Sequence, residues 1–126
     1  RALIVHGRDG LDEVTTTAAT LVCELNGGNI REYEVTPEDF GLRRTDLAEL
    51  AGGTPDENAA IILGVLEGRP GAPLDVALLN AGAAIYAAGQ AESIGAGLEQ
   101  ARQSVHSGAA RAKLEQLKSM TGGGLS

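Results

Sequence analysis

Short β-prone runs occupy the first third of the chain. Residues 2–5 are uniformly apolar and predict a buried strand, and the latter half of residues 15–24, rich in Thr, Val and Leu, predicts a second. The turn at residues 26–29 contains two glycines, which accept positive φ, and β-prone residues 30–35 follow it. Such a pattern predicts a β-hairpin. Pro37 ends this strand, and residues 37–46 are expected to form a loop.

Helical periodicity begins in the middle of the chain. Thr54 and Glu57 stand at the first and last positions of a capping box, with Pro55 at the first helical position. Apolar residues then recur at helical spacing until Gly68, where the helix is expected to end.

Three more helices are predicted downstream. Residues 74–88 are Ala-rich and apolar almost all round, which is typical of a central, buried helix. A third helix is expected over about residues 93–105, and a fourth over about residues 109–117 with Ser107 as its cap. A few strands followed by about four helices predict an α/β fold.

Size and composition place these elements in one unit. The chain has 126 residues, of which 43% are hydrophobic and only 2% aromatic, so its core is expected to be aliphatic. We expect residues 1–126 to form a single domain with a glycine-rich, frayed tail at residues 121–126. Arg1 stands directly before a strand, without an initiator Met or a leading helix, which suggests that the chain is a piece of a longer protein.

Charge and cysteine usage narrow the class of protein. The formal net charge of −7 argues against a nucleic-acid partner, which requires clustered Lys and Arg. The single cysteine, Cys23, excludes an internal disulfide and is expected to be a small core residue in a reducing compartment. No apolar run reaches the roughly 20 residues of a membrane span. The sequence therefore predicts a cytoplasmic protein with no membrane partner.

The candidate chemistry lies in residues 6–13, His-Gly-Arg-Asp-Gly-Leu-Asp-Glu, directly after the first predicted strand. Two interpretations of Asp12 and Glu13 are open. Adjacent acids often occupy the first turn of a helix, where its dipole favours them. The β-branched residues 14–17 that follow are poor helix formers, however, and acids on a loop match the carboxylate ligands that magnesium prefers. His6 is expected to be structural, and Arg8 and Asp9 are expected to make turn contacts.

The same segment resembles the HGxxGxDE motif of anthranilate phosphoribosyltransferases. Residues 36–42, 52–59 and 79–89 are similar to later segments of that family, in the same order. The resemblance extends over nearly the whole chain and covers only the C-terminal part of the enzyme. It implies the C-terminal portion of a catalytic α/β domain of the nucleoside phosphorylase/phosphoribosyltransferase type.

The resemblance also implies a reaction and a site. Anthranilate would displace pyrophosphate from phosphoribosyl pyrophosphate (PRPP) in tryptophan biosynthesis, with Asp12 and Glu13 binding the Mg²⁺ ions on PRPP and Glu13 as the bridging ligand. Asn58 and Asn80 fall in matching segments without an implied catalytic role. The family's upstream PRPP loop and anthranilate contacts are not in this chain, so we expect this piece to be inactive alone and the full-length protein to be a homodimer.

Two alternative functions share this fold. One is a pyrimidine nucleoside phosphorylase. The other is a non-enzymatic relative that binds nucleic acid, against which the acidic balance and the Asp12–Glu13 pair both count.

Overall fold

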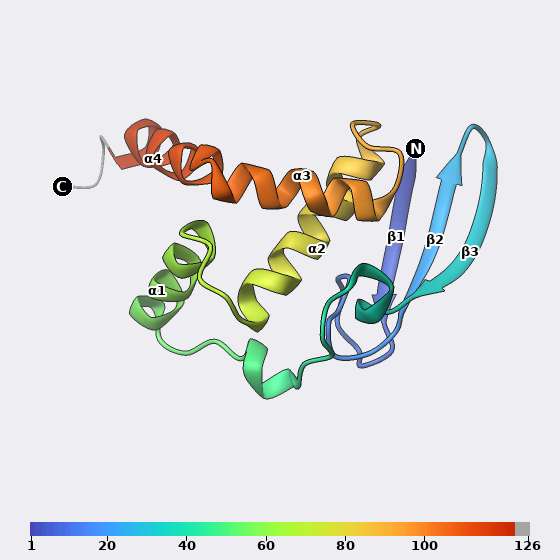
Figure 1. Ribbon diagram of the computed structural model, residues 1–126, viewed down its shortest axis with the longest axis horizontal. Coiled ribbons are helices and arrows are strands. Elements are labelled where there is room, and N and C mark those ends of the chain that lie inside the picture. The colour runs from blue at the N-terminus through green and yellow to red at the C-terminus, as the bar shows by residue number, and fades with distance from the viewer. Residues whose placement is uncertain (123–126) are drawn as a thin grey trace.

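A computed structural model describes residues 1–122 and contains an antiparallel sheet followed by helices (Figure 1). The elements are β1 (Ala2–Gly7), β2 (Thr20–Asn26), β3 (Asn29–Val35), the short 3₁₀ helices η1 (Pro37–Phe40) and η2 (Leu47–Leu50), α1 (Pro55–Leu66), α2 (Ala72–Ala87), α3 (Ile94–His106) and α4 (Ala109–Thr121). The predicted α/β class is confirmed for the described residues.

The sheet has the order β1-β2-β3, and both neighbouring pairs are antiparallel. The predicted hairpin is confirmed: Asn26 pairs with Asn29, and Gly27 and Gly28 have φ of 57° and 83°, which only glycine adopts at little cost. The first strand is not buried as predicted. Ile4 is 72% exposed because alternate side chains of β1 point to opposite faces of the sheet, and Leu3 and Val5, not Ile4, pack against the core.

One face of the sheet packs against the helices (Figure 1). Val22 of β2 is fully buried, whereas Cys23, the next residue, is only half-buried and lies opposite the exposed Ile4. The prediction that Cys23 is a core residue is therefore wrong. Side chains alternate between faces along a strand, and this residue falls on the outer face.

The predicted helix signals are largely confirmed. The Thr54 hydroxyl accepts from the Glu57 amide at 3.3 Å, and the Glu57 carboxylate accepts from the Thr54 amide at 2.7 Å. Gly68 follows α1 with φ of 73°. The prediction for α4 needs correction, because Gly108 and not Ser107 occupies its N-cap position and the helix extends to Thr121.

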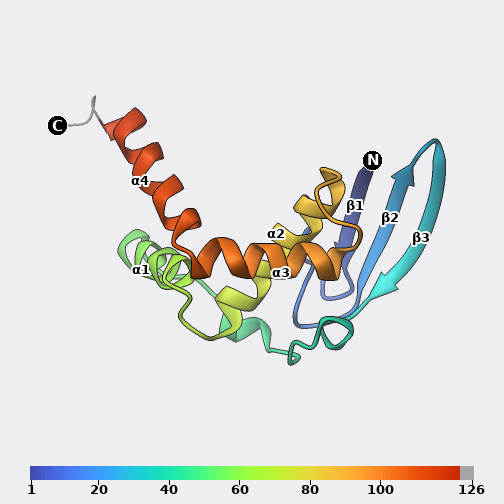
Figure 2. The same ribbon diagram turned by 45° about the horizontal axis from the view of Figure 1, so that its top comes forward.

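Helix α2 is the centre of the molecule, as predicted. It contacts α1, α3, η2 and β1, and α3 lies across it (Figure 2). Its buried Leu78, Leu79 and Ala83 join Leu98 of α3 in the core. The α2–α3 crossing is close enough that a Cβ on Gly82 would lie 2.5 Å from the Leu98 nitrogen.

The segment predicted as a loop at residues 37–46 contains the 3₁₀ helix η1. Thr36 and Asp39 form its capping box, and the Thr36 amide donates to Asp39 at 2.7 Å. Within residues 1–122, no helix combines the length and the apolar character needed to cross a membrane. The frayed tail is predicted over residues 121–126. Thr121 instead ends α4, and residues 123–126 lie outside the described residues.

Candidate functional site

Residues 8–19, which we call the acidic loop, connect β1 to β2 and carry Asp12 and Glu13. None of these residues is helical. The interpretation of the acids as dipole-favoured residues of a first helical turn is therefore wrong, and they lie on a loop between strands. The loop lies at the same end of the sheet as the segment that contains η1 (Figure 2). Thr45 of that segment ties the two together by donating its amide to the Thr16 carbonyl at 2.9 Å.

Asp9 organises the first half of the acidic loop. Its carboxylate accepts hydrogen bonds from the Thr15 hydroxyl at 2.6 Å and from the Leu11 amide at 3.1 Å. It also accepts one from the Thr17 hydroxyl. Burial acts to raise the pKa of the Asp9 carboxyl, but these hydrogen bonds outweigh burial and hold the pKa below its ordinary value. Asp9 is thus a structural anion, and the prediction that it makes turn contacts is confirmed.

Asn80 of α2 holds the second half of the loop. Its Oδ1 accepts the Val14 amide at 2.9 Å, and its Nδ2 donates to the Val14 carbonyl at 2.8 Å and to the Val76 carbonyl at 2.9 Å. Val14 itself is 1% exposed and belongs to the core. A single side chain therefore satisfies both backbone groups of a buried loop residue, as a neighbouring strand would.

Asp12 and Glu13 lie between these two anchored parts. Asp12 is exposed and Glu13 is half-buried. Among the described residues neither carboxylate accepts a hydrogen bond or forms an ion pair. The carboxylate oxygens therefore keep their full capacity to bind a cation.

Two carboxylates suit a metal site shared with a substrate better than a site made only of protein ligands. Residues 1–122 contain no cluster of three or more His, Cys, Asp or Glu side chains arranged to hold an ion. A cage made entirely of protein ligands is thus not formed by the described residues. Mg²⁺ commonly binds through one or two carboxylates together with substrate phosphates, and Asp12 and Glu13 fit that arrangement.

His6, Arg8 and Asn58 make their contacts away from Asp12 and Glu13. His6 is exposed on β1, and Arg8 forms an ion pair with Glu34 of β3 at 2.6 Å. Asn58 accepts the Gly53 amide at 2.8 Å and so supports the start of α1. Of the two asparagines, only Asn80 contacts the acidic loop.

Residue-by-residue reasoning missed the role of Asn80 and the burial of Glu24. Glu24 is 2% exposed and accepts the Tyr86 hydroxyl at 2.6 Å and the Tyr33 hydroxyl at 3.0 Å. The hydrogen bond from Tyr86, with further bonds from Arg31 and Tyr33, lowers the Glu24 pKa against the effect of burial. The available signal for Asn80 was an amide in an otherwise apolar helix, where a buried polar group needs partners.

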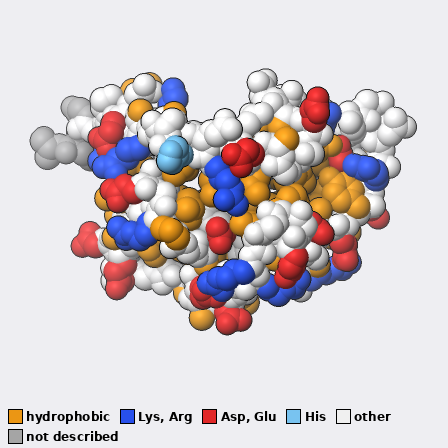
Figure 3. All heavy atoms as spheres, in the orientation of Figure 1, with side chains coloured by type: hydrophobic (Ala, Val, Ile, Leu, Met, Phe, Trp, Pro, Cys, Tyr) orange, Lys and Arg blue, Asp and Glu red, His pale blue; other side chains and the backbone are white. Residues whose placement is uncertain are grey.

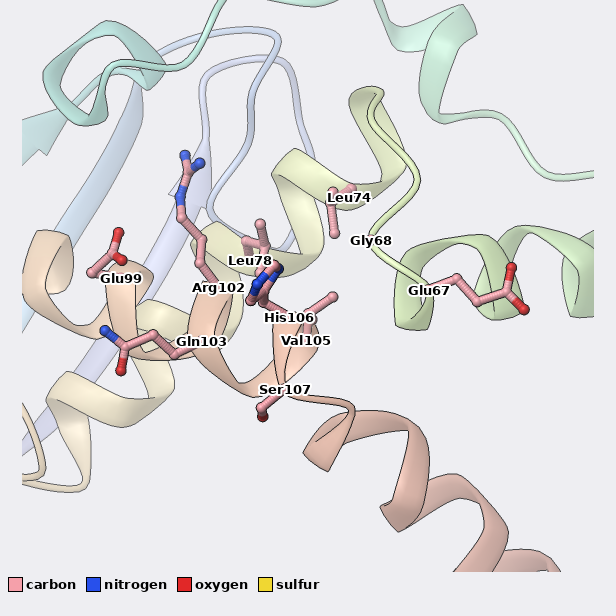
Figure 4. Close-up of a pocket in the computed structure, with 10 residues that line it drawn as sticks. All are labelled: Glu67, Gly68, Leu74, Leu78, Glu99, Arg102, Gln103, Val105, His106 and Ser107. Atoms are coloured by element: carbon pink, nitrogen blue, oxygen red, sulfur yellow. The ribbon is translucent and has the colours of Figure 1, made fainter.

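The hollow shown in Figure 4 does not include the acidic loop. It has a volume of about 620 Å³ and lies between the end of α1, the start of α2 and the second half of α3. Leu74 and Leu78 of α2 line it together with Arg102 and His106 of α3. Among the described residues, the side chains of Arg102 and His106 form no ion pair or hydrogen bond.

A second cavity touches the acidic loop. It is lined by Glu13 and by apolar residues of η2, α1 and α2, including Leu50, Ile62 and Val76.

Acidic and basic side chains are interspersed over the face in Figure 3, so this face carries no continuous basic patch.

Comparisons with known proteins show the family of the chain. A family model described as "Glycosyl transferase family, a/b domain" matches residues 1–111. Anthranilate phosphoribosyltransferase from Verminephrobacter eiseniae is 56% identical over 119 residues, which are 94% of this chain and 35% of that protein. The Dechloromonas aromatica enzyme of the same name is 51% identical over 121 residues, 96% of this chain and 36% of that protein. The chain thus spans about a third of the length of these relatives.

Solved structures show the same relation. Anthranilate phosphoribosyltransferase from Thermus thermophilus superposes with a TM-score of 0.82 at 41% identity, covering 92% of this chain and 34% of that one. The Saccharomyces cerevisiae enzyme in complex with PRPP and Mg superposes with a TM-score of 0.79 at 31% identity, covering 90% of this chain and 33% of that one.

Proposed function

The chain belongs to the glycosyl transferase family, as its a/b domain, and from this membership we propose that it supplies the magnesium-binding third of an anthranilate phosphoribosyltransferase. In this proposal residues 1–126 form a single domain, the C-terminal part of the catalytic domain, and Asp12 and Glu13 are the metal ligands. The piece alone lacks activity, because it spans only about a third of its relatives.

The observation that carries the proposal is that the acidic loop is held by other side chains and leaves both candidate ligands without a partner within residues 1–122. Asp9 and Asn80 satisfy the surrounding backbone groups, while Asp12 and Glu13 have no partner among the described residues. Asp9 in the same loop accepts three hydrogen bonds, so the loop uses one carboxylate for its own structure and leaves the two that follow available to a cation. The yeast relative whose structure contains PRPP and Mg supports the identity of the ligand.

The proposed reaction forms a bond between the anthranilate nitrogen and C1 of PRPP, breaks the bond from C1 to the pyrophosphate oxygen, and releases a proton from the amine. The sugar carbon gains oxocarbenium character in the transition state. When bound, Mg²⁺ supplies charge neutralisation at the diphosphate leaving group. Asp12 and Glu13 contribute by holding and orienting that cation–substrate unit, with Glu13 as the bridging ligand.

The remaining functional assignments follow from this proposal. The product places the full-length protein in tryptophan biosynthesis, and we propose a cytoplasmic homodimer with PRPP and anthranilate as its small-molecule partners. Nucleic acid and membranes are not partners. The net charge of −7 supports the first of these exclusions, since it disfavours binding to phosphate backbones.

A hybrid enzyme tests the function. This chain replaces the matching third of the Verminephrobacter eiseniae enzyme, and phosphoribosyl-anthranilate formation is assayed with PRPP and Mg²⁺. We expect an active hybrid in which Asp12→Asn lowers kcat/KM for PRPP by at least about tenfold, since one of two carboxylate ligands loses its charge.

Asp56→Asn is the matched control, because Asp56 is also an exposed aspartate without a hydrogen-bond or ion-pair partner among residues 1–122. It should leave kcat/KM within about twofold of the unsubstituted hybrid. Equal turnover in Asp12→Asn and Asp56→Asn would contradict the site assignment. A hybrid that cleaves pyrimidine nucleosides with phosphate, or that binds DNA in a salt-dependent manner, would instead favour one of the two alternative functions.

A further inference from the structure

Asn80 makes its three side-chain hydrogen bonds at the place where α2 passes the acidic loop. The amide oxygen accepts from the Val14 nitrogen at 2.9 Å, and the amide nitrogen donates to the Val14 and Val76 oxygens at 2.8 and 2.9 Å. The Val14 N–H can bond only to the amide oxygen of Asn80, and the Val14 carbonyl only to the amide nitrogen, so the two bonds fix the orientation of this side-chain amide. Val14 and Asn80 are 66 positions apart in the sequence, so this is a tertiary contact.

Val14 directly follows Glu13, so its contact with Asn80 restrains the backbone next to the candidate ligands. The Val14 nitrogen belongs to the peptide unit that also contains the Glu13 carbonyl, so holding it fixes the plane that follows Glu13. On the other side, Leu11 is held through its nitrogen by Asp9 at 3.1 Å and through its oxygen by the Gly7 amide at 2.8 Å. Asp12 and Glu13 therefore lie between two residues, Leu11 and Val14, whose backbone groups are held by hydrogen bonds.

We infer that Asn80 is a positioning residue for the metal site: it fixes the backbone after Glu13 and thereby presents Asp12 and Glu13 to the cation on a diphosphate substrate. The inference rests on the proposed function. It assigns Asn80 no contact with substrate or metal. Its effect passes through the Val14 backbone alone.

Hydrogen bonding, and not packing, is what this role requires. Val14 is 1% exposed, so solvent cannot replace the partners that Asn80 provides to its backbone. Leu has the same number of side-chain heavy atoms as Asn and the same branching at Cγ, but neither donor nor acceptor. Asn80→Leu therefore retains bulk on α2 while leaving both Val14 groups unsatisfied, and Asn80→Ala removes both the bulk and the hydrogen bonds.

The test uses the 126-residue chain and two NMR measurements. The first is backbone amide hydrogen exchange at Asp12, Glu13 and Val14 without metal. The second is a titration with Mn²⁺ and PRPP, followed by paramagnetic broadening at the same residues. Tyr86→Phe is the matched control, because it removes one buried hydrogen bond from the same helix, to Glu24, without contacting the loop.

In the unsubstituted chain we expect the Val14 amide to exchange at least about 100-fold more slowly than that of Asp12, a comparison that needs no variant. Asn80→Leu and Asn80→Ala should both accelerate Val14 exchange at least about tenfold relative to Tyr86→Phe. Both should also weaken Mn²⁺–PRPP binding at least about fivefold, whereas Tyr86→Phe should not.

The possible failures are distinguishable. If the unsubstituted chain binds Mn²⁺ with PRPP and Asp12→Asn does not, but Asn80→Leu binds as the unsubstituted chain does, the positioning role is overturned and the proposed function stands. The positioning role is also overturned by a Val14 amide that exchanges as fast as that of Asp12. If the unsubstituted chain shows no broadening with Mn²⁺ and PRPP and the hybrid enzyme is also inactive, the metal role of the loop is overturned, and with it the proposed function. If the chain shows no broadening but the hybrid enzyme is active, Asn80→Leu and Tyr86→Phe are compared by kcat/KM for PRPP in the hybrid, and equal values overturn the positioning role.

Discussion

At the scale of single residues, the structure gives two kinds of carboxylate different surroundings. Asp9 and Glu24 accept several hydrogen bonds each, and both pKa values are lowered below their ordinary values despite burial. Asp12 and Glu13 accept none from the described residues. Within the acidic loop, hydrogen bonding therefore distinguishes Asp9, which holds the loop together, from Asp12 and Glu13, whose carboxylate oxygens can bind a cation.

Glu24 gives a stability prediction. Its pKa in the folded state is below the ordinary value of 4.5, so its contribution is complete above pH 4.5 and is lost as the pH falls through and below that value. Glu24→Gln should lower the free energy of unfolding at pH 7 by about 1–3 kcal/mol, because a neutral amide replaces a buried, hydrogen-bonded anion. It should also flatten the fall in stability between pH 5 and pH 3, measured by urea denaturation at each pH. An equal pH dependence in both proteins would show that Glu24 does not contribute to it.

At the scale of elements, the α2–α3 crossing depends on two glycines that face each other. A Cβ on Gly82 would meet the Leu98 backbone, and one on Gly97 would meet the Gly82 carbonyl oxygen. Backbone atoms cannot move aside as flexible side chains do, so the helices would have to separate. The crossing in turn positions α2, from which Asn80 contacts the acidic loop.

Gly82→Ala and Gly97→Ala should each destabilise the fold by about 1–3 kcal/mol, because overpacking at the crossing outweighs the gain in helix propensity. Gly95→Ala is the control in the same helix as Gly97, since its added Cβ would meet nothing nearer than 3.8 Å. That variant should be neutral or stabilised by up to about 1 kcal/mol. Thermal unfolding followed by circular dichroism compares the three. Similar losses at Gly95 and Gly97 would indicate that the close approach is not the cause.

At the scale of the whole molecule, the described residues form a sheet with one face against the helices and a loop at one end that carries the candidate ligands (Figure 2). The outer face of the sheet includes Ile4 and Ile30, each 72% exposed. The core lies on the other side and includes Val14 of the acidic loop. Asp12 and Glu13 directly precede this core residue. A ligand that binds them only in the folded state stabilises the whole fold.

Mg²⁺ and PRPP together should raise the melting temperature of the chain, because a ligand that binds only the folded state stabilises it by mass action, by about 2.7 kcal/mol at 100 times the dissociation constant. Asp12→Asn should abolish most of this rise, and Asp56→Asn should preserve it. Differential scanning fluorimetry with PRPP alone, Mg²⁺ alone and both separates the contributions. An equal rise in the two variants would place the binding elsewhere.

Local signals predicted most of the elements. The capping box at Thr54 and Glu57, the glycine turn at Gly27 and Gly28 and the stop at Gly68 act within a few residues, so the sequence displays them directly. The burial of the first strand and of Cys23 was predicted wrongly. Which face of a strand is buried depends on what packs on the sheet, which local pattern does not contain.

The order of the elements, the resemblance to anthranilate phosphoribosyltransferases and the candidate ligands Asp12 and Glu13 could all be read from the sequence. Two facts required the folded structure: these acids lie on a loop without partners among the described residues, and Asn80, 66 residues after Val14, holds that loop. The physical reason is the range of the interactions. Capping and turn formation act between near neighbours, whereas the partners of a buried backbone group are set by which distant elements the folded chain brings together.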